Sequence, residues 1–228
     1  MSEDELREAR REARVEATLF VLLALILLVA LAVASLAAGW ELLGLEGWLW
    51  LVLCVPELLL IAAFALSADT TANDAARRRR LLTLLAVMGV GNAAGLFVLI
   101  GALLTEASND LSGGQLLTSG VVVWLTNVIV FGLWYWTLDS GGPMRRALQG
   151  RPVPDFLFPQ DDPGTPGREG WYPRLEDYVY VALTNGIAFS PTDAMPLSRW
   201  AKASMAAESM ISVAAILLVA ARAVNVLG

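Results

Sequence analysis

The sequence predicts an all-α, polytopic helical membrane protein with about five transmembrane helices and one short re-entrant or interfacial half-helix. Three observations predict this class. Hydrophobic residues make up 57% of the 228 residues and charged residues only 17%, whereas a soluble domain is about one quarter charged. The apolar residues form runs long enough to cross about 30 Å of hydrocarbon. The charged residues lie mostly between these runs.

The residue types that are missing exclude most enzyme chemistries. The chain has one cysteine, Cys54, and no histidine. An intrachain disulfide, a Cys/His metal site and a nucleophile activated by histidine are therefore excluded. A lipid-modifying enzyme would need a catalytic pair from Asp161, Asp162 and Asp193, and the first two lie in a Pro/Gly-rich stretch typical of a solvated turn. We expect no catalytic residue, no metal and no cofactor, and the net charge of −6 argues against nucleic acid as a partner.

The N-terminal half predicts a charged helix and three spans. Residues 1–17 alternate acidic and basic side chains and predict a solvent-exposed helix that continues into the first apolar run. Residues 18–104 form a three-helix transmembrane region. Its spans are expected at Thr18–Ala38, Trp48–Leu66 and Leu81–Leu104, each with about the 20 residues that cross a bilayer.

The remaining region, residues 105–228, has a different organisation. A span at 116–138 precedes a loop at 139–174, which holds seven of the ten prolines and predicts an aqueous segment with little regular structure. The half-helix at 175–190 is too short to span the bilayer. A polar turn at 190–197 follows it, and the last span is expected at 205–226.

Basic residues predict the orientation. They occur in the N-terminal segment, before the third span and between the fourth and fifth spans, and they are absent from the two other connections. The positive-inside rule then places the N-terminus in the cytoplasm and the C-terminus outside. We expect a multi-pass protein of the cell (plasma) membrane.

Four polar residues stand inside the predicted spans. Glu57, Asn92 and Asn127 fall at nearly the same depth, and Glu208 lies nearer the loop-side end of the last span, one turn before Ser212. A charged side chain at the bilayer centre costs at least about 2.5–3.5 kcal/mol, so these residues are expected to face the bundle interior. Two interpretations stay open: a protonated Glu57 that hydrogen-bonds an asparagine and joins helices, or a layer that binds protons or cations.

The order of segments in the C-terminal region resembles the pore module of potassium channels. Asp177 to Thr184 is similar to its pore helix, and Ser190 to Pro196 is similar to its filter turn, with Asp193 and Pro196 matching the family's Asp-x-x-Pro. The resemblance implies an oligomeric pore lined by the half-helix and the turn. The pore or filter-like residues that it singles out are Thr184, Asn185, Ser190, Pro191, Thr192, Asp193 and Pro196.

The same turn departs from the family in its glycines. Ser190, Pro191 and Thr192 stand where the family has glycine residues around an aromatic one. Proline fixes its own φ, so a column of backbone carbonyls selective for potassium is not expected. The resemblance also places the 139–174 loop outside the cell, whereas the positive charges place it inside, and both orientations stay open.

The sequence thus predicts an ion-channel-like or permeation-related membrane protein without a functional potassium-selectivity filter. We expect it to contact the lipid bilayer and to form a homo-oligomer. The alternative is a non-catalytic membrane scaffold or accessory subunit. It would bind a membrane partner protein or anionic lipid through its loop and its Arg-rich segments.

Overall fold

The computed structural model describes residues 3–40, 47–65, 74–104, 113–143, 145–146, 153–162, 164–165, 171–190 and 193–227. These residues are almost entirely helical, as predicted. The helices are α1 (Glu3–Ala37), α2 (Trp48–Ala65), α3 (Asp74–Leu104), α4 (Gly113–Leu138), α6 (Leu175–Ala188) and α7 (Arg199–Leu227). Short elements join α4 to α7: the 3-10 turns η2 (Asp139–Gly141) and η3 (Pro159–Asp161), and the strands β1 (Phe156–Leu157) and β2 (Met195–Pro196).

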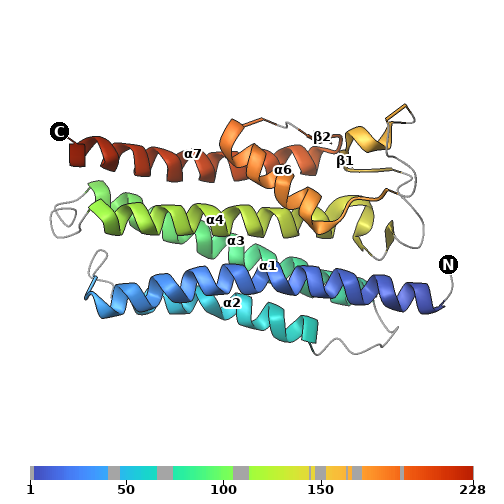
Figure 1. Cartoon of the computed structure of the whole chain (residues 1–228), viewed down its shortest axis with the longest axis horizontal. Coiled ribbons are helices and arrows are strands. Elements are labelled where there is room, and N and C mark those ends of the chain that lie inside the picture. Colours follow the sequence, from blue (N-terminus) through green and yellow to red (C-terminus); the bar gives the residue numbers. More distant parts are fainter. Residues whose placement is uncertain are drawn as a thin grey trace.

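Five of the helices, α1, α2, α3, α4 and α7, lie side by side along the long axis of the molecule (Figure 1). The helix α1 runs without a break from the charged N-terminal segment into the first apolar run, as predicted. The N-terminus lies at the same end of the bundle as the segment between α4 and α7, and the C-terminus lies at the opposite end. We call these the loop end and the far end.

The lengths and compositions of the helices fit a multi-pass membrane protein. Four segments are long and apolar enough to cross a bilayer: Val15–Ala37, Arg78–Gly101, Gly114–Gly141 and Arg199–Leu218. The predicted second span falls on α2, which is apolar but has only 18 residues. At 1.5 Å per residue it is about 27 Å long, slightly less than the hydrocarbon thickness.

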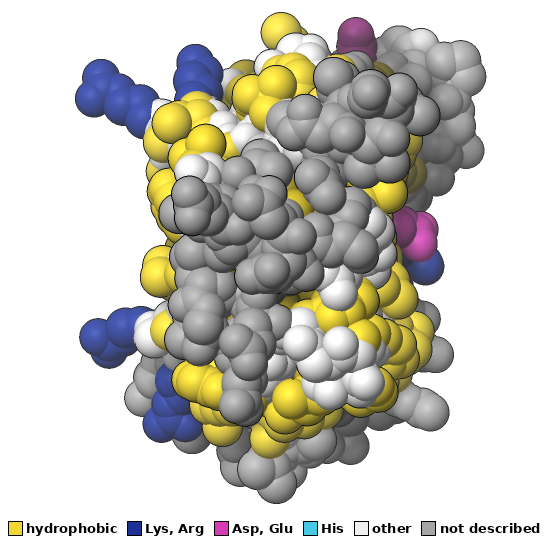
Figure 2. Space-filling model, turned by 90° about the vertical axis from the view of Figure 1, so that its left-hand side faces the viewer, with side chains coloured by type: hydrophobic (Ala, Val, Ile, Leu, Met, Phe, Trp, Pro, Cys, Tyr) yellow, Lys and Arg dark blue, Asp and Glu magenta, His cyan; other side chains and the backbone are white. Residues whose placement is uncertain are grey.

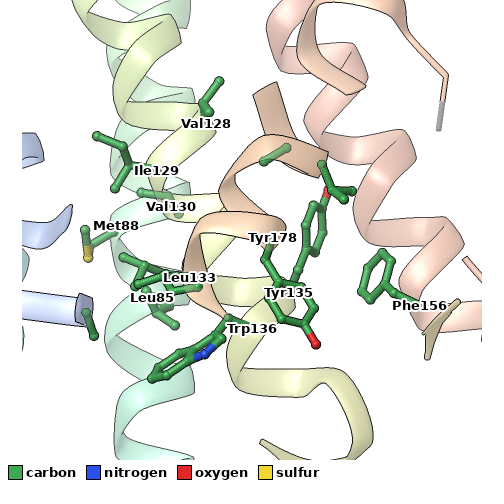
Figure 3. Packing of buried hydrophobic residues seen from close by; sticks show 14 of the residues in the cluster. Leu85, Met88, Val128, Ile129, Val130, Leu133, Tyr135, Trp136, Phe156 and Tyr178 are labelled. Carbon is green, nitrogen blue, oxygen red and sulfur yellow. The ribbon is translucent and has the colours of Figure 1, made fainter. Parts of the chain in front are cut away.

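The central helix is α4, which packs against α1, α3, α6 and α7. On one side, Val128 and Leu133 of α4 join Leu85 and Met88 of α3 in a buried cluster (Figure 3). A second buried cluster, which includes Trp50, Leu99, Leu116 and Leu218, holds the other half of the bundle together. Because α4 contributes to both clusters, it joins the N-terminal helices to α6 and α7.

The described part of the 139–174 segment packs onto the loop end of the bundle. Its strand β1 pairs antiparallel with β2, and both Phe156 and Phe158 are buried. The ring centroid of Phe156 lies 4.9 Å from that of Tyr135 and 6.0 Å from that of Trp200. The regular elements are short, in line with the prolines and glycines. The segment nevertheless buries its aromatic side chains, which the expectation of an aqueous loop did not include.

The sides of the bundle are apolar. Large hydrophobic side chains are exposed along α1, α2, α3 and α7, and Val90 and Phe97 of α3 are 71% and 73% exposed. Seen end-on from the far end, the described surface is mostly hydrophobic or uncharged, and basic side chains project beyond its outline (Figure 2). An apolar belt of this extent fits a surface that faces lipid.

Candidate functional site

The half-helix α6 begins at the loop end and stops level with the middle of the bundle. At its start, the guanidinium of Arg174 lies 3.8 Å from the carboxylate of Glu16, next to the first residue of the first span. Near its other end, a Cβ atom added to Gly186 would lie 3.0 Å from Ser212 Oγ and 3.5 Å from Trp124 Nε1. Trp124 is the twelfth of 26 residues in α4, and Ser212 is the fourteenth of 29 in α7. The helix α6 therefore extends along about half of both neighbours.

A glycine lets α6 lie directly against α4. A Cβ atom added to Gly132 would lie 2.7 Å from Val179 Cγ2 and 2.8 Å from Val179 Cα. A side chain at position 132 would therefore push the backbone of α6 away from α4. Small residues that allow such close approach are a usual feature of helix contacts in membranes.

The chain reverses direction directly after α6. Phe189 adopts a left-handed conformation (φ 54°, ψ 27°), and its N–H donates a hydrogen bond to the Asn185 carbonyl at 3.0 Å. The chain then returns to the loop end, where β2 pairs with β1 and the Leu197 N–H donates to the Asp155 carbonyl at 2.8 Å. The segment from α6 to β2 thus enters and leaves at one end of the bundle.

The first turn of α6 carries negative charge. The carboxylate of Asp177 accepts a hydrogen bond from the Arg174 N–H at 2.7 Å. Burial raises the pKa of Asp177, the hydrogen bond from Arg174 lowers it, and the negative charges of Glu176 and Asp193 raise it. Asp193 is half-buried on the returning chain. The returning chain therefore passes close enough to α6 for the two carboxylates to interact.

A buried carboxylate joins α4, α6 and α7. Glu208 of α7 is fully buried, and its Oε2 accepts hydrogen bonds from Tyr135 Oη of α4 at 2.6 Å and from Asn185 Nδ2 of α6 at 2.7 Å. Asn185 Nδ2 also donates to the Met205 carbonyl, and Ser209 Oγ donates to Asn185 Oδ1 at 3.2 Å. Three helices thus share one polar network, whose acceptor is the Glu208 carboxylate.

A second buried carboxylate lies on the opposite face of α4. Glu57 of α2 and Asn92 of α3 are 2% and 4% exposed and line a common cavity together with Thr126 of α4. Asn92 Nδ2 donates to the Val123 carbonyl at 3.0 Å. Among the described residues, Glu57 Oε2 and Asn92 Oδ1 have no hydrogen-bond partner.

The predicted polar layer is therefore divided by α4. Glu57 and Asn92 share the cavity on one side, and on the other side Asn127 Nδ2 donates to Ser212 Oγ at 3.3 Å. Glu208 lies one helical turn before Ser212 and accepts hydrogen bonds from Tyr135 and Asn185. No hydrogen bond between described side chains connects the Glu57 side to the Glu208 side.

At the loop end, Asp139 holds the 139–174 segment against the bundle. It is fully buried at the end of α4, and its Oδ1 accepts the N–H groups of Asp155 at 2.7 Å and of Phe156 at 3.3 Å. Tyr178 of α6 donates its hydroxyl to Asp139 Oδ2. In Figure 3, Tyr135, Tyr178 and Phe156 lie near one another, in the region where α6 packs against α4 and α7.

A buried arginine reinforces this junction. Arg146 Nη1 donates to the carbonyl oxygens of Trp136 at 2.8 Å and Asp139 at 2.7 Å. Its guanidinium carbon lies 5.2 Å from the ring centroid of Tyr178, within the range of a cation–π interaction. Carbonyls at the end of α4, which have no donor within the helix, thus receive one from a charged side chain.

The residues predicted for the filter-like turn have different environments. Thr184 Oγ1 donates to the Tyr180 and Val181 carbonyls of its own helix, and Ser190 is exposed. Pro191 and Thr192 lie outside the described residues. Asp193 is half-buried, and Pro196 pairs with Phe156 in the two-stranded sheet. Of these residues, Asn185 alone has a described contact with a residue of the predicted polar layer.

The sequence did not predict a functional role for Tyr135, Asp139 or Tyr178. A signal for Tyr135 was present, because it lies eight residues after Asn127 and therefore on the same side of α4. Asp139 directly follows an apolar span, but nothing local distinguishes it from an ordinary interfacial residue. In the part of the chain that is described, no group of three or more His, Cys, Asp or Glu side chains could hold a metal ion.

Comparisons with known proteins give no family for this chain. No protein-family model matches it, and neither a curated protein nor a solved structure is significantly similar to it.

Proposed function

We propose that this membrane protein is channel-like, and that its α4–α6–α7 unit forms the permeation element. The observation that supports the proposal best is the depth of α6, which stops level with Trp124 and Ser212, near the middles of α4 and α7. The following chain turns at Phe189 and goes back to the end from which α6 came. In a bilayer, α6 would then be a re-entrant half-helix.

The direction of α6 favours a cation. Its N-terminus lies at the loop end, so its C-terminal carbonyl groups point toward the middle of the bundle. The C-terminal end of a helix carries a partial negative charge, and half-helices in membrane proteins use this end to hold cations at mid-depth. The turn lacks the glycines of a potassium filter, so we propose permeation without potassium selectivity.

A pore lined by the turn would need more than one copy of the chain. Tyr180, Ile187 and Phe189 of α6, and Met195 and Leu197 of the returning chain, are each about half exposed or more. The turn therefore lies on the outer side of the bundle and not along an axis within it. A pore lined by the turn would form where several copies place these surfaces around a common axis, so we propose a homo-oligomer.

The proposed orientation follows the basic side chains. Arg78, Arg79, Arg80, Arg199 and Lys202 belong to helix ends at the loop end of the bundle. We therefore propose that the loop end and the N-terminus are cytoplasmic, that the C-terminus is outside, and that the membrane is the cell membrane.

Ion flux in liposomes tests the proposal. Purified protein is reconstituted into vesicles, and the movement of monovalent cations is followed with an entrapped dye. We expect flux in the wild type and a several-fold reduction in Asp193→Asn, which removes the half-buried charge from the returning chain. Asp162→Asn, an exposed carboxylate in the same region, is the matched control and is expected to conduct normally. A strictly monomeric protein in mild detergent, or vesicles without flux, would overturn the proposal.

The same exposed residues favour a second candidate function. The apolar face formed by Tyr180, Ile187, Phe189, Met195 and Leu197 could pack against another membrane protein, as expected for a non-catalytic scaffold or accessory subunit. In that case vesicles show no flux, and purification from the native membrane recovers one partner in constant stoichiometry.

A further inference from the structure

A small cavity lies between α2, α3 and α4. It has a volume of about 10 Å³ open to water-sized molecules and is lined by both polar and apolar side chains. Its polar lining comes from three helices: Glu57 of α2, Asn92 of α3 and Thr126 of α4. A space of this size holds about one water-sized occupant.

Two buried side-chain oxygens of the residues that line the cavity have no described donor. Glu57 Oε2 and Asn92 Oδ1 are buried, and neither has a hydrogen-bond partner among the described residues. Thr126 Oγ1 donates its proton to the Val122 carbonyl at 2.8 Å, so its remaining lone pairs can only accept. Asn92 Nδ2 is used by the Val123 carbonyl. The cavity therefore offers three oxygen atoms and lacks a described donor to satisfy them.

Among the described side chains, the Glu57 carboxylate also has no positively charged partner. The ion pair found among the described side chains joins Arg174 to Glu16 at the loop end and does not involve Glu57. A buried carboxylate without a counter-charge is costly in a bilayer, and such residues mark sites for ions or protons.

Proline leaves one backbone carbonyl of α2 without its usual donor. Pro56 lies inside α2 and lines the cavity. Since proline has no N–H, the carbonyl of Val52 loses its usual helical donor one turn earlier. Backbone carbonyls freed in this way coordinate sodium ions and protons in other membrane proteins.

We propose that Glu57, Asn92 and Thr126 form a binding site for one small monovalent cation. Three oxygen ligands and a single carboxylate suit a singly charged ion, because Ca²⁺ requires six to eight oxygen ligands and Mg²⁺ strict octahedral geometry. Sodium and hydronium share this chemistry, and the experiment below separates them. The site lies on the opposite face of α4 from the permeation element and does not depend on the proposed function.

A link between helices through a protonated Glu57 is the alternative to a bound cation. A protonated Glu57 acting as such a link would donate its hydrogen to a neighbouring oxygen. The available amide oxygen, Asn92 Oδ1, has no described partner. Both residues line one cavity, so a cation shared between their oxygens would supply the partner that each of them lacks.

Thermal unfolding in an uncharged detergent tests for sodium. The melting temperature of the wild type is compared in sodium chloride and in choline chloride at equal concentration. A ligand that binds only the folded state raises this temperature as its concentration exceeds the dissociation constant. We expect sodium to raise the melting temperature of the wild type but not of Glu57→Gln. Glu176→Gln, at the start of α6 and outside the cavity, should respond like the wild type.

Infrared difference spectroscopy tests for hydronium. If sodium has no effect on the melting temperature, a carboxyl band that changes with pH and disappears in Glu57→Gln identifies the proton as the occupant. Should Glu57→Gln fail to fold, Thr126→Val removes one ligand at nearly constant shape and is expected to weaken the sodium response several-fold. If neither sodium nor pH produces a signal that depends on Glu57, the proposal is wrong. Both measurements are independent of ion flux, so they can succeed or fail separately from the permeation proposal.

Discussion

The two faces of α4 each carry a buried carboxylate, and the two differ in what surrounds them. On the face toward α6 and α7, Glu208 receives hydrogen bonds from Tyr135 and Asn185. On the face toward α2 and α3, Glu57 Oε2 has no described partner and lies at a cavity. The two side chains are almost equally buried: Glu208 is 0% exposed and Glu57 is 2% exposed. Burial alone therefore does not distinguish a structural acidic residue from a binding one.

The difference is the supply of donors to one carboxylate oxygen, because Glu208 Oε2 receives two hydrogen bonds while Glu208 Oε1, like Glu57 Oε2, has no described partner. A carboxylate that accepts two hydrogen bonds stabilises the helices that provide the donors. The Glu57 carboxylate, whose Oε2 receives no described hydrogen bond, keeps an uncompensated charge unless a proton or a cation binds to it. Glu208 is therefore expected to stabilise the folded protein, whereas Glu57 is expected to bind a proton or a cation. Four sets of substitutions test this contrast.

The largest effect is expected from Asp139→Ala. This change removes the acceptor of the Asp155 and Phe156 N–H groups and of the Tyr178 hydroxyl. Each buried donor left without an acceptor costs about 1–3 kcal/mol, so we expect a loss of about 4 kcal/mol or more. The melting temperature in detergent should fall steeply, and limited proteolysis should cut the segment that follows α4. The control, Asp162→Ala, changes an exposed residue and should alter neither the melting temperature nor the proteolysis pattern. Similar behaviour of the two variants would contradict the assigned role of Asp139.

The paired changes Glu208→Leu and Glu57→Leu test the comparison directly. Glu208→Leu leaves Tyr135 Oη and Asn185 Nδ2 without their acceptor, which we expect to lower the free energy of unfolding by about 2–4 kcal/mol. Glu57→Leu leaves no described donor unpaired and removes an uncompensated buried charge, so it should be neutral or stabilising. Unfolding in detergent measures both. The reverse order of stabilities would show that the two carboxylates have exchanged roles.

A smaller effect is expected where α6 meets α4. In Gly132→Ala the new methyl group would lie 2.8 Å from Val179 Cα, which forces the backbones apart and costs about 1–3 kcal/mol. The matched control is Gly89→Ala on α3, where the nearest atom, Val130 Cγ1, lies at an ordinary 3.7 Å. Equal melting temperatures for these two variants would mean that α6 is not held closely against α4.

The last test is expected to leave stability unchanged and locates the two ends of the bundle. In a Cys54→Ala background, Gly164→Cys reports on the loop end and Leu104→Cys on the far end. Leu104 is 79% exposed, and a Cβ atom at Gly164 has a single ordinary contact, with Asp162 Oδ1 at 3.7 Å. If the positive-inside rule holds, an impermeant thiol reagent applied to intact cells should label the Leu104→Cys variant but not the Gly164→Cys variant. Labelling of the Gly164→Cys variant alone would give the potassium-channel orientation.

The long helices could be predicted from the sequence because apolar runs are local. The starts of helices were harder to place. The last span was expected from Met205, but α7 begins at Arg199, where Ser198 Oγ accepts the Ala201 N–H at 3.2 Å and caps the helix. The six residues in between include Trp200 and Lys202, which belong to the polar end of a membrane helix and not to its apolar run.

The candidate sites were predictable only in part. Equal depths in neighbouring spans indicated Glu57 and Asn92, and the structure places both at one cavity. The partners of Glu208 could not be found in this way, because Tyr135 and Asn185 are 73 and 23 residues away along the chain. The buried environment of Asp139 was missed for the same reason. The Pro/Gly-rich composition around it indicates turns but not whether the turns are packed.

The sharing of Glu208 also sets an order of events during synthesis. Tyr135 and Asn185 leave the ribosome before the acceptor that both of them need. Until α7 enters the membrane, the Tyr135 hydroxyl and the Asn185 amide have no carboxylate to which they can donate. The helix α6 is also too short to remain in the bilayer alone. The half-helix is therefore expected to dock only after α7 has been inserted, so that the C-terminal region completes its assembly as one late, cooperative step.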